Sequence, residues 1–196
     1  MNYSFIVAEC LHLYHQNQAK MKSIFFGSIL ICVLSFFSAG TLIAQKTEHK
    51  KPVPGTTAIK TFDNGIKLNI KGFKVKEAAL YFDDDTKVPA DNKVDLNQRI
   101  NMLIIIDSGW TVKNEKVYLG GSELIKLNTG AEVLKSNDLF KDYDETGVSP
   151  EDAKYITLKA IITSLENKKN FLVVTFRIWD KKSTNEITGS YKFYIK

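Results

Sequence analysis

Cysteine and histidine are nearly absent from this chain of 196 residues. It contains 2 Cys and 3 His. Cys10 and Cys32 lie close to the start, and His49 is the last histidine. Beyond that position the chain offers neither an imidazole nor a thiol. This absence excludes Ser-His-Asp and Cys-His catalysis, histidine-bound zinc and thiol redox chemistry from the rest of the sequence.

Phosphate-binding glycine motifs are missing as well. Neither G-x-x-x-x-G-K-[ST] nor G-x-G-x-x-G occurs, so no nucleotide-cradling loop is expected. The charge is mild, because 27 Lys and Arg against 22 Asp and Glu give a net charge of +5. The basic residues are dispersed rather than clustered. We therefore expect no cofactor and no nucleic-acid partner.

The scarcity of histidine and cysteine does not exclude catalysis by carboxylates alone, since glycoside hydrolysis requires only two acids. A general acid has to sit among apolar or aromatic neighbours that raise its pKa. Asp107 and Asp180 come nearest to such a setting, but both end predicted strands where turns should expose them. The protein is not expected to be an enzyme, and a secreted carboxylate-based hydrolase is a distant alternative.

One long apolar run lies near the N-terminus. Residues 24–44 carry no charge, Lys22 precedes them, and the small residues Ser38, Gly40 and Ala44 stand near their end. A basic start, an apolar centre and a small-residue exit are typical of a secretory signal peptide. The sequence therefore predicts a signal peptide at 21–44, whose loss would also remove both cysteines.

The signal peptide divides the chain into four parts. Residues 1–20 are expected to be a non-native or upstream extension, 21–44 the signal peptide and 45–56 a Lys- and Pro-bearing linker. A folded domain should occupy 57–196. The protein is expected to be secreted or periplasmic, without a stable membrane span after cleavage. The alternative is an inner-membrane anchor through 24–44, which is long enough to cross a bilayer.

Beyond residue 56 the pattern is that of β-structure. Asn64-Gly65 separates two alternating apolar runs, the strongest short-range signal of a hairpin. Gly120-Gly121 is expected to break or bulge a strand. A single helical turn is expected at Ser149-Pro150-Glu151-Asp152, where Ser can cap the N-terminus and Pro occupies the first position. Strands are predicted at 58–62, 66–73, 79–82, 99–107, 117–119, 124–127, 131–134, 156–163, 171–180 and 186–195.

This order contains no βαβ alternation. About eight to nine strands joined by short turns predict an all-β fold, which we interpret as an antiparallel immunoglobulin- or fibronectin-like β-sandwich. A β-barrel is the alternative.

The acidic loops are candidates for binding a metal ion. Asp142-Tyr143-Asp144-Glu145-Thr146-Gly147 begins like a calcium-binding loop, but Ala153 stands where the twelfth-position Glu belongs. No metal is therefore expected. The weak candidates for a non-standard calcium site are Asp138, Asp142, Asp144 and Asp152.

Aromatic and basic residues on the last two strands suggest a binding face. Between 171 and 180, apolar residues alternate so that Phe176 and Ile178 point inward and Arg177 and Trp179 point outward. The returning strand should place Lys192 and Tyr194 on the same face. An Arg and a Trp close together suit recognition of a sugar or a protein.

Trp110 completes the predicted binding residues, which are Trp110, Arg177, Trp179, Lys192 and Tyr194. The alternative is that the two tryptophans are partly buried within the sandwich.

The chain resembles small exported β-sandwich proteins of uncharacterised function from Gram-negative bacteria. The resemblance lies in the export signal, the linker and the segments Gly109-Trp110, Val117-Tyr118-Leu119-Gly120 and Asn137-Asp138-Leu139-Phe140. It implies the fold but transfers no site. The expected function is a non-catalytic binding or interaction module of the cell envelope, with a protein or glycan partner. The alternative is a structural, stalk-like envelope component.

Overall fold

The structure, a computed structural model, describes residues 57–165 and 170–196. The predicted extension (1–20), signal peptide (21–44) and linker (45–56) lie outside the described residues. Within the described ranges, no helix has the length and apolar character needed to cross a membrane.

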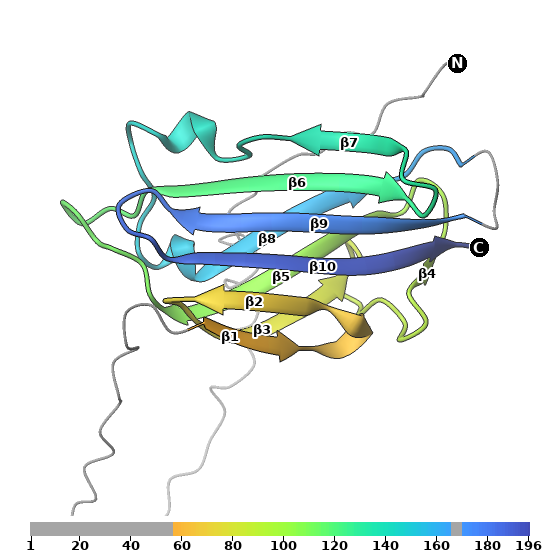
Figure 1. The fold of residues 1–196 in the computed structure, drawn as a ribbon, viewed down its shortest axis with the longest axis horizontal. Helices are drawn as coiled ribbons and strands as arrows, with labels where there is room; N and C mark the ends of the chain where they lie inside the picture. Colours follow the sequence, from red (N-terminus) through yellow and green to blue (C-terminus); the bar gives the residue numbers. More distant parts are fainter. Residues whose placement is uncertain (1–56, 166–169) are drawn as a thin grey trace, which may run out of the picture. The chain divides into compact units, whose positions relative to one another are not determined.

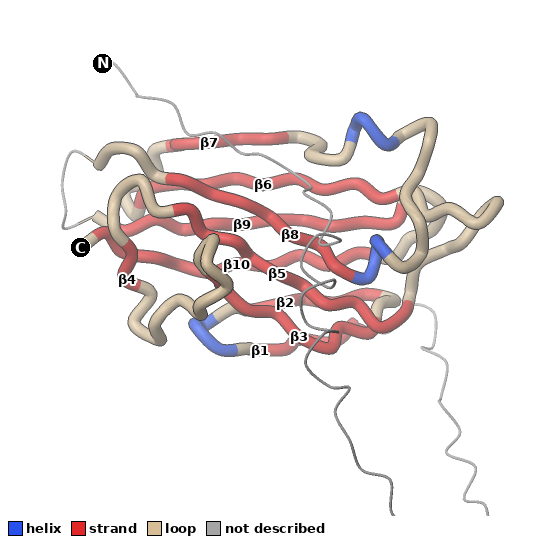
Figure 2. The backbone as a smooth tube through the Cα atoms, turned by 180° about the vertical axis from the view of Figure 1, so that it is seen from behind, coloured by secondary structure: helices blue, strands red, loops and turns tan. Residues whose placement is uncertain are grey.

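Two β-sheets make up the described domain (Figures 1 and 2). The larger has seven strands in the order β1-β2-β10-β9-β6-β7, with β4 pairing on β10. Its pairings are antiparallel except for the parallel pair of β4 and β10. Its strands are β1 (Thr57–Thr61), β2 (Lys67–Lys71), β4 (Lys93–Val94), β6 (Leu119–Leu127), β7 (Glu132–Ser136), β9 (Phe171–Asp180) and β10 (Glu186–Ile195).

The smaller sheet has three antiparallel strands in the order β3-β5-β8. These are β3 (Lys74–Tyr81), β5 (Arg99–Ser108) and β8 (Tyr155–Ile161). This sheet lies behind the large one in Figure 1 and in front of it in Figure 2. The predicted all-β antiparallel sandwich is confirmed. Because the strands form two separate sheets rather than one closed sheet, the barrel alternative is wrong.

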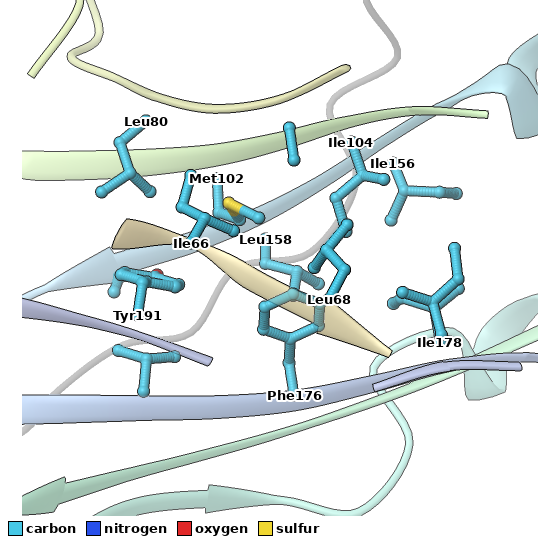
Figure 3. Close-up of a cluster of buried hydrophobic side chains, with 14 of the residues drawn as sticks. Ile66, Leu68, Leu80, Met102, Ile104, Ile156, Leu158, Phe176, Ile178 and Tyr191 are labelled. Carbon is cyan, nitrogen blue, oxygen red and sulfur yellow. The ribbon is translucent and has the colours of Figure 1, made fainter. Parts of the chain in front are cut away.

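The core lies between the two sheets (Figure 3). On β9 the inward positions Leu172, Val174, Phe176 and Ile178 are at most 4% exposed, as the alternation predicts. Met102 on β5 is fully buried on the opposite side. Burying each such side chain stabilises the fold by about 1.5–3 kcal/mol, so this double layer holds residues 57–165 and 170–196, which contain no cysteine, together.

The start of β3 and the presence of β4 (Lys93–Val94) depart most from the prediction. β3 begins at Lys74 rather than at residue 79, because the pairing with β5 shifts register on both sides of Val75 and so interrupts the alternation. The two-residue β4 is too short to leave a periodic signature.

Gly120 and Gly121 do not break their strand. They lie inside β6, which pairs with β9 in one continuous register from Leu119 to Leu127. A Cβ at Gly120 would lie 2.1 Å from the ring of Trp179, and one at Gly121 would lie 2.4 Å from the ring of Phe140. The glycines therefore leave room for an aromatic ring on each face of the sheet.

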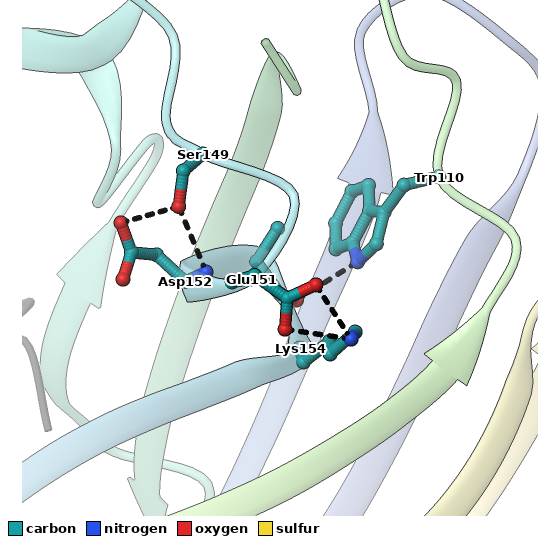
Figure 4. Close-up of polar contacts among 6 residues, drawn as sticks. Trp110, Ser149, Glu151, Asp152 and Lys154 are labelled. Atoms are coloured by element: carbon teal, nitrogen blue, oxygen red, sulfur yellow. Dashed lines mark hydrogen bonds and ion pairs between the residues drawn. The ribbon is translucent and has the colours of Figure 1, made fainter. Parts of the chain in front are cut away.

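Helical structure in the described residues is limited to three short 3₁₀ turns, η2 (Asp63–Gly65), η3 (Lys141–Tyr143) and η4 (Asp152–Lys154). At η2 the left-handed φ angles of Asn64 (59°) and Gly65 (67°) form the predicted turn between β1 and β2. At η4 the Ser149 hydroxyl accepts a hydrogen bond from the Asp152 N–H at 3.1 Å (Figure 4).

Candidate functional site

The outer face of the large sheet, the side turned away from β3, β5 and β8, is open and faces the viewer in Figure 1. Small polar side chains occupy its centre. Thr175 on β9, Thr188 and Ser190 on β10, and Ser122 on β6 all alternate with buried residues and therefore point outward.

Strand register arranges the outward side chains in two rows that cross the sheet. Row A contains Asn69, Thr188, Arg177 and Ser122, on β2, β10, β9 and β6. Row B contains Lys67, Ser190, Thr175, Leu124 and Lys135, and reaches β7. On the four strands that the rows share, each residue of row B is two positions from its row A counterpart, so the rows run parallel across the strands.

A groove of about 650 Å³ lies between the two rows. Its floor is the main chain of the intervening row, in which Leu68, Phe176 and Glu123 turn their side chains into the core while Gly189 has none. Ile59 on β1 and Asn137 after β7 line it as well. From β2 to β7 the sheet spans four strand intervals, or roughly 19 Å. The groove can therefore hold an extended polymer lying across the strands.

Arg177 of row A forms a cluster with Trp179 and Glu186. The guanidinium of Arg177 lies 4.9 Å from the ring centroid of Trp179, a cation–π distance. Arg177 also forms an ion pair with Glu186 at 2.7 Å. The indole of Trp179 lies over Gly120 on the next strand. These contacts hold a partly exposed aromatic surface beside the groove.

A second hollow adjoins row B. It measures about 300 Å³, and Thr175 lines it as well as the groove. Phe171 forms one wall, with the ammonium of Lys192 at 5.2 Å from its ring centroid and Tyr194 at 5.4 Å between centroids. Lys126 and Asn128 complete the polar part of the lining.

Four of the five residues predicted as a binding face share this surface. Arg177 and Trp179 lie on one side of the groove, and Lys192 and Tyr194 lie beyond it on the other side. Trp110 lies elsewhere. It is partly buried against the core, and its ring centroid lies 4.7 Å from that of Phe73. Its indole N–H donates a hydrogen bond to the Ala153 carbonyl at 2.8 Å (Figure 4).

Sequence reasoning did not single out Ser122, Lys67 or Lys135. Alternation within each strand places these residues outward, but their position in the groove depends on pairings between strands far apart in the sequence. Glu123 was also missed. It is 2% exposed beneath the groove floor, and burial raises the pKa of its carboxyl group to about 7.

Asp138, Asp144 and Asp152, three of the four weak calcium candidates, form hydrogen bonds or ion pairs with other residues of the protein. Burial alone would raise the pKa of Asp138, but hydrogen bonds from Lys181 and from the Phe140 and Gly121 N–H groups outweigh it and lower the pKa. Asp144 also pairs with Lys181, and Asp152 accepts a hydrogen bond from Ser149 at 2.7 Å. Across residues 57–165 and 170–196, no group of three or more His, Cys, Asp and Glu side chains is arranged to hold a metal ion.

The two acids weighed as catalytic candidates have different surroundings. Asp107 is exposed and pairs with Lys74 at 2.6 Å. Asp180 is not exposed at its turn as expected, because it is 1% exposed and accepts hydrogen bonds from the Thr111 and Lys182 N–H groups and the Ser183 hydroxyl, each at 2.8 Å. Asp180 therefore fixes two loops together.

No protein-family model and no curated protein matches this chain. Among solved structures, the crystal structure of the C-terminal domain of wzt is similar, with a TM-score of 0.41 and 13% sequence identity. The match covers 74% of this chain and 82% of that one. A likeness this distant assigns neither a family nor a site.

Proposed function

We propose that this protein is an exported, non-catalytic module that binds a linear glycan in the groove on the outer face of its large sheet. The groove itself carries the proposal. It is open, measures about 650 Å³ and crosses the sheet from β1 to β7. Its length suits an extended chain better than a small molecule, which is usually enclosed on most sides.

The lining favours a glycan over a protein partner. Thr188, Ser190 and Ser122 present hydroxyl groups, which can both donate and accept hydrogen bonds as sugar hydroxyls do. The hydroxyl of Thr175 donates to the Leu124 carbonyl at 3.3 Å and keeps its oxygen as an acceptor. Protein interfaces concentrate their binding energy on aromatic anchors in desolvated central pockets. Here the aromatic Trp179 lies at the margin, where the exposed part of its ring can contact a sugar.

Placement at the cell envelope is supported by the sequence alone. The charge-free run at 24–44 with its small-residue exit, followed by the linker at 45–56, is typical of an exported domain displayed on a short tether. An exported glycan-binding module would meet polysaccharides at the cell surface or in the periplasm.

Affinity electrophoresis tests the proposal with the purified protein in gels containing linear neutral or acidic polysaccharides. At least one polymer should retard the protein. Arg177→Ala and Trp179→Ala should each weaken binding roughly fivefold or more, since truncating a hot-spot residue costs above about 1 kcal/mol. Lys76→Ala and Tyr155→Ala, on exposed positions of the small sheet, are the matched controls.

Two outcomes contradict the proposal. One is a folded protein that no polysaccharide retards, which would favour a structural envelope component. The other is binding that the groove variants leave unchanged although circular dichroism shows them folded. Selective capture of a protein partner that Trp179→Ala abolishes would instead assign this face to a protein interface.

A further inference from the structure

The outer face of the large sheet carries an excess of positive charge. The strand registers and burial patterns place both signs on this face, but cations outnumber carboxylates. On these strands the outward cations are Lys67, Lys71, Lys93, Lys126, Lys135, Arg177 and Lys192, and the outward carboxylates are Glu132 and Glu186.

Both of these carboxylates are already paired. Glu186 binds Arg177 at 2.7 Å, and Glu132 lies 3.4 Å from Lys126. Among the described residues that line the groove, the only acid is Glu123, whose side chain is buried on the core side of the sheet. The groove therefore presents no free carboxylate from the described residues to repel an anion.

Lys67 and Lys135 stand at opposite ends of row B. Both are exposed, and no described carboxylate forms an ion pair with either of them. Lys67 lies on β2 and Lys135 on β7, four strand intervals or roughly 19 Å apart. This separation exceeds the Debye length of about 8 Å at physiological salt, so the two ammonium groups act as independent anion contacts.

We infer that the groove selects an acidic polysaccharide, an inference that rests on the proposed function. Acidic groups spaced along one chain reach Lys67 and Lys135 together, whereas a small anion can contact only one of them. The hydroxyl-bearing centre of the groove contacts the sugar rings between those charges. A neutral glycan forms only the contacts with the hydroxyl-bearing centre of the groove, and none with a charge.

Three probes test this inference, namely polygalacturonate, the same polymer with its carboxyl groups reduced to alcohols, and polyglutamate. Polygalacturonate should bind most tightly, the reduced polymer at least about fivefold more weakly, and polyglutamate more weakly than polygalacturonate. Binding of polygalacturonate should also weaken as salt rises, because the ammonium contacts are exposed.

Lysine variants test whether Lys67 and Lys135 produce the preference for an acidic polysaccharide. Lys67→Ala and Lys135→Ala should each weaken polygalacturonate binding about threefold to fivefold, the size expected for one exposed ion pair. Both changes should weaken binding of the reduced polymer less than they weaken binding of polygalacturonate, because only the native polymer carries carboxylates. The double variant should lose roughly tenfold, Lys→Arg at either position should retain binding, and Lys76→Ala on the small sheet should have no effect.

The outcomes separate the inference from the function on which it rests. Equal binding of the native and reduced polymers overturns the acidic preference and leaves the glycan site standing. Equal binding of polygalacturonate and polyglutamate shows attraction to charge alone and overturns both. Binding of none of the three probes overturns the acidic preference, whereas the glycan site is overturned only if no other polysaccharide retards the protein. An acidic preference that remains in the double lysine variant overturns the role of Lys67 and Lys135 and assigns the preference to another surface.

Discussion

The side chains of Glu123 and Tyr191 lie close enough inside the sandwich for the charge of Glu123 to influence Tyr191. Burial raises the pKa of both groups, and the carboxylate of Glu123 raises the pKa of Tyr191 further. Within the described part of the chain, neither the carboxyl oxygens nor the phenol oxygen has a hydrogen-bond partner. A buried, unpaired carboxyl group is tolerated best while it carries a proton.

Glu123 should therefore make the domain less stable as the pH rises. Its pKa in the folded protein is about 7, against 4.5 for an ordinary Glu. Because the folded state holds the proton more tightly, the associated stability is full below about pH 4.5 and is lost as the pH rises through 7. The loss is about 3 kcal/mol by pH 8.

Urea unfolding between pH 5 and 8 checks this linkage. Glu123→Gln keeps the shape of the protonated side chain and should remove most of the pH dependence, while the exposed Glu145→Gln should preserve it. An unchanged pH profile in Glu123→Gln would show that another group is responsible.

Removing the buried carboxylate of Asp180, at the end of β9, should destabilise the domain strongly. Asp180→Ala leaves the Thr111 and Lys182 N–H groups and the Ser183 hydroxyl without their acceptor. We expect a loss of about 3 kcal/mol in the free energy of unfolding, measured by urea denaturation. Asp180→Asn retains one acceptor and should lose less, and the exposed Asp142→Ala should change little. A loss below about 1 kcal/mol in Asp180→Ala would contradict this role.

Strand alternation predicts the faces of β9 and β10 well, because both strands pair along their length in continuous register. The same alternation would have identified Glu123 as an inward residue, two positions beyond Gly121. Treating Gly120-Gly121 as a break interrupted the pattern at that point. The glycines serve ring packing instead, and no local rule distinguishes a glycine that breaks a strand from one that accommodates a ring.

The groove could be predicted only in part. Thr175 and Arg177 are identifiable from β9 alone, and Ser190 from β10. Their alignment with Ser122 and Lys135 requires β6 to pair with β9, about fifty residues later, and β7 to pair with β6. Such long-range register is set by which faces pack together, which single-strand patterns do not encode.

Trp110 should affect stability without affecting the ligand. Trp110→Phe retains an aromatic ring against Phe73 but removes the hydrogen bond to the Ala153 carbonyl. We expect a loss of about 1 kcal/mol in urea unfolding, because the freed carbonyl loses its donor. Polysaccharide binding should equal that of the unaltered protein. Weakened polysaccharide binding in a variant that remains folded would contradict this prediction and show that Trp110 belongs to the binding site.

Trp110→Phe also leaves Trp179 as the only tryptophan, since the chain contains 2 Trp. In that background, Gly120→Ala tests the position of the Trp179 ring without removing it. The added methyl would lie 2.1–2.5 Å from three atoms of the indole, so the ring has to move away from β6. The backbone of Gly120 is not among the chain's left-handed positions, and β6 should continue to pair with β9.

Intrinsic fluorescence and affinity electrophoresis then report two linked changes. The Trp179 emission should shift to longer wavelength as the displaced ring becomes more exposed. Polysaccharide binding should fall toward that of Trp179→Ala, because the ring no longer stands beside row A with Arg177. Gly130→Ala is the matched control, since no atom lies within 4 Å of its added Cβ, although its φ of +91° adds local strain. If the emission shifts and binding stays unchanged, the indole is not a ligand contact, and the hydroxyl-bearing rows alone form the site.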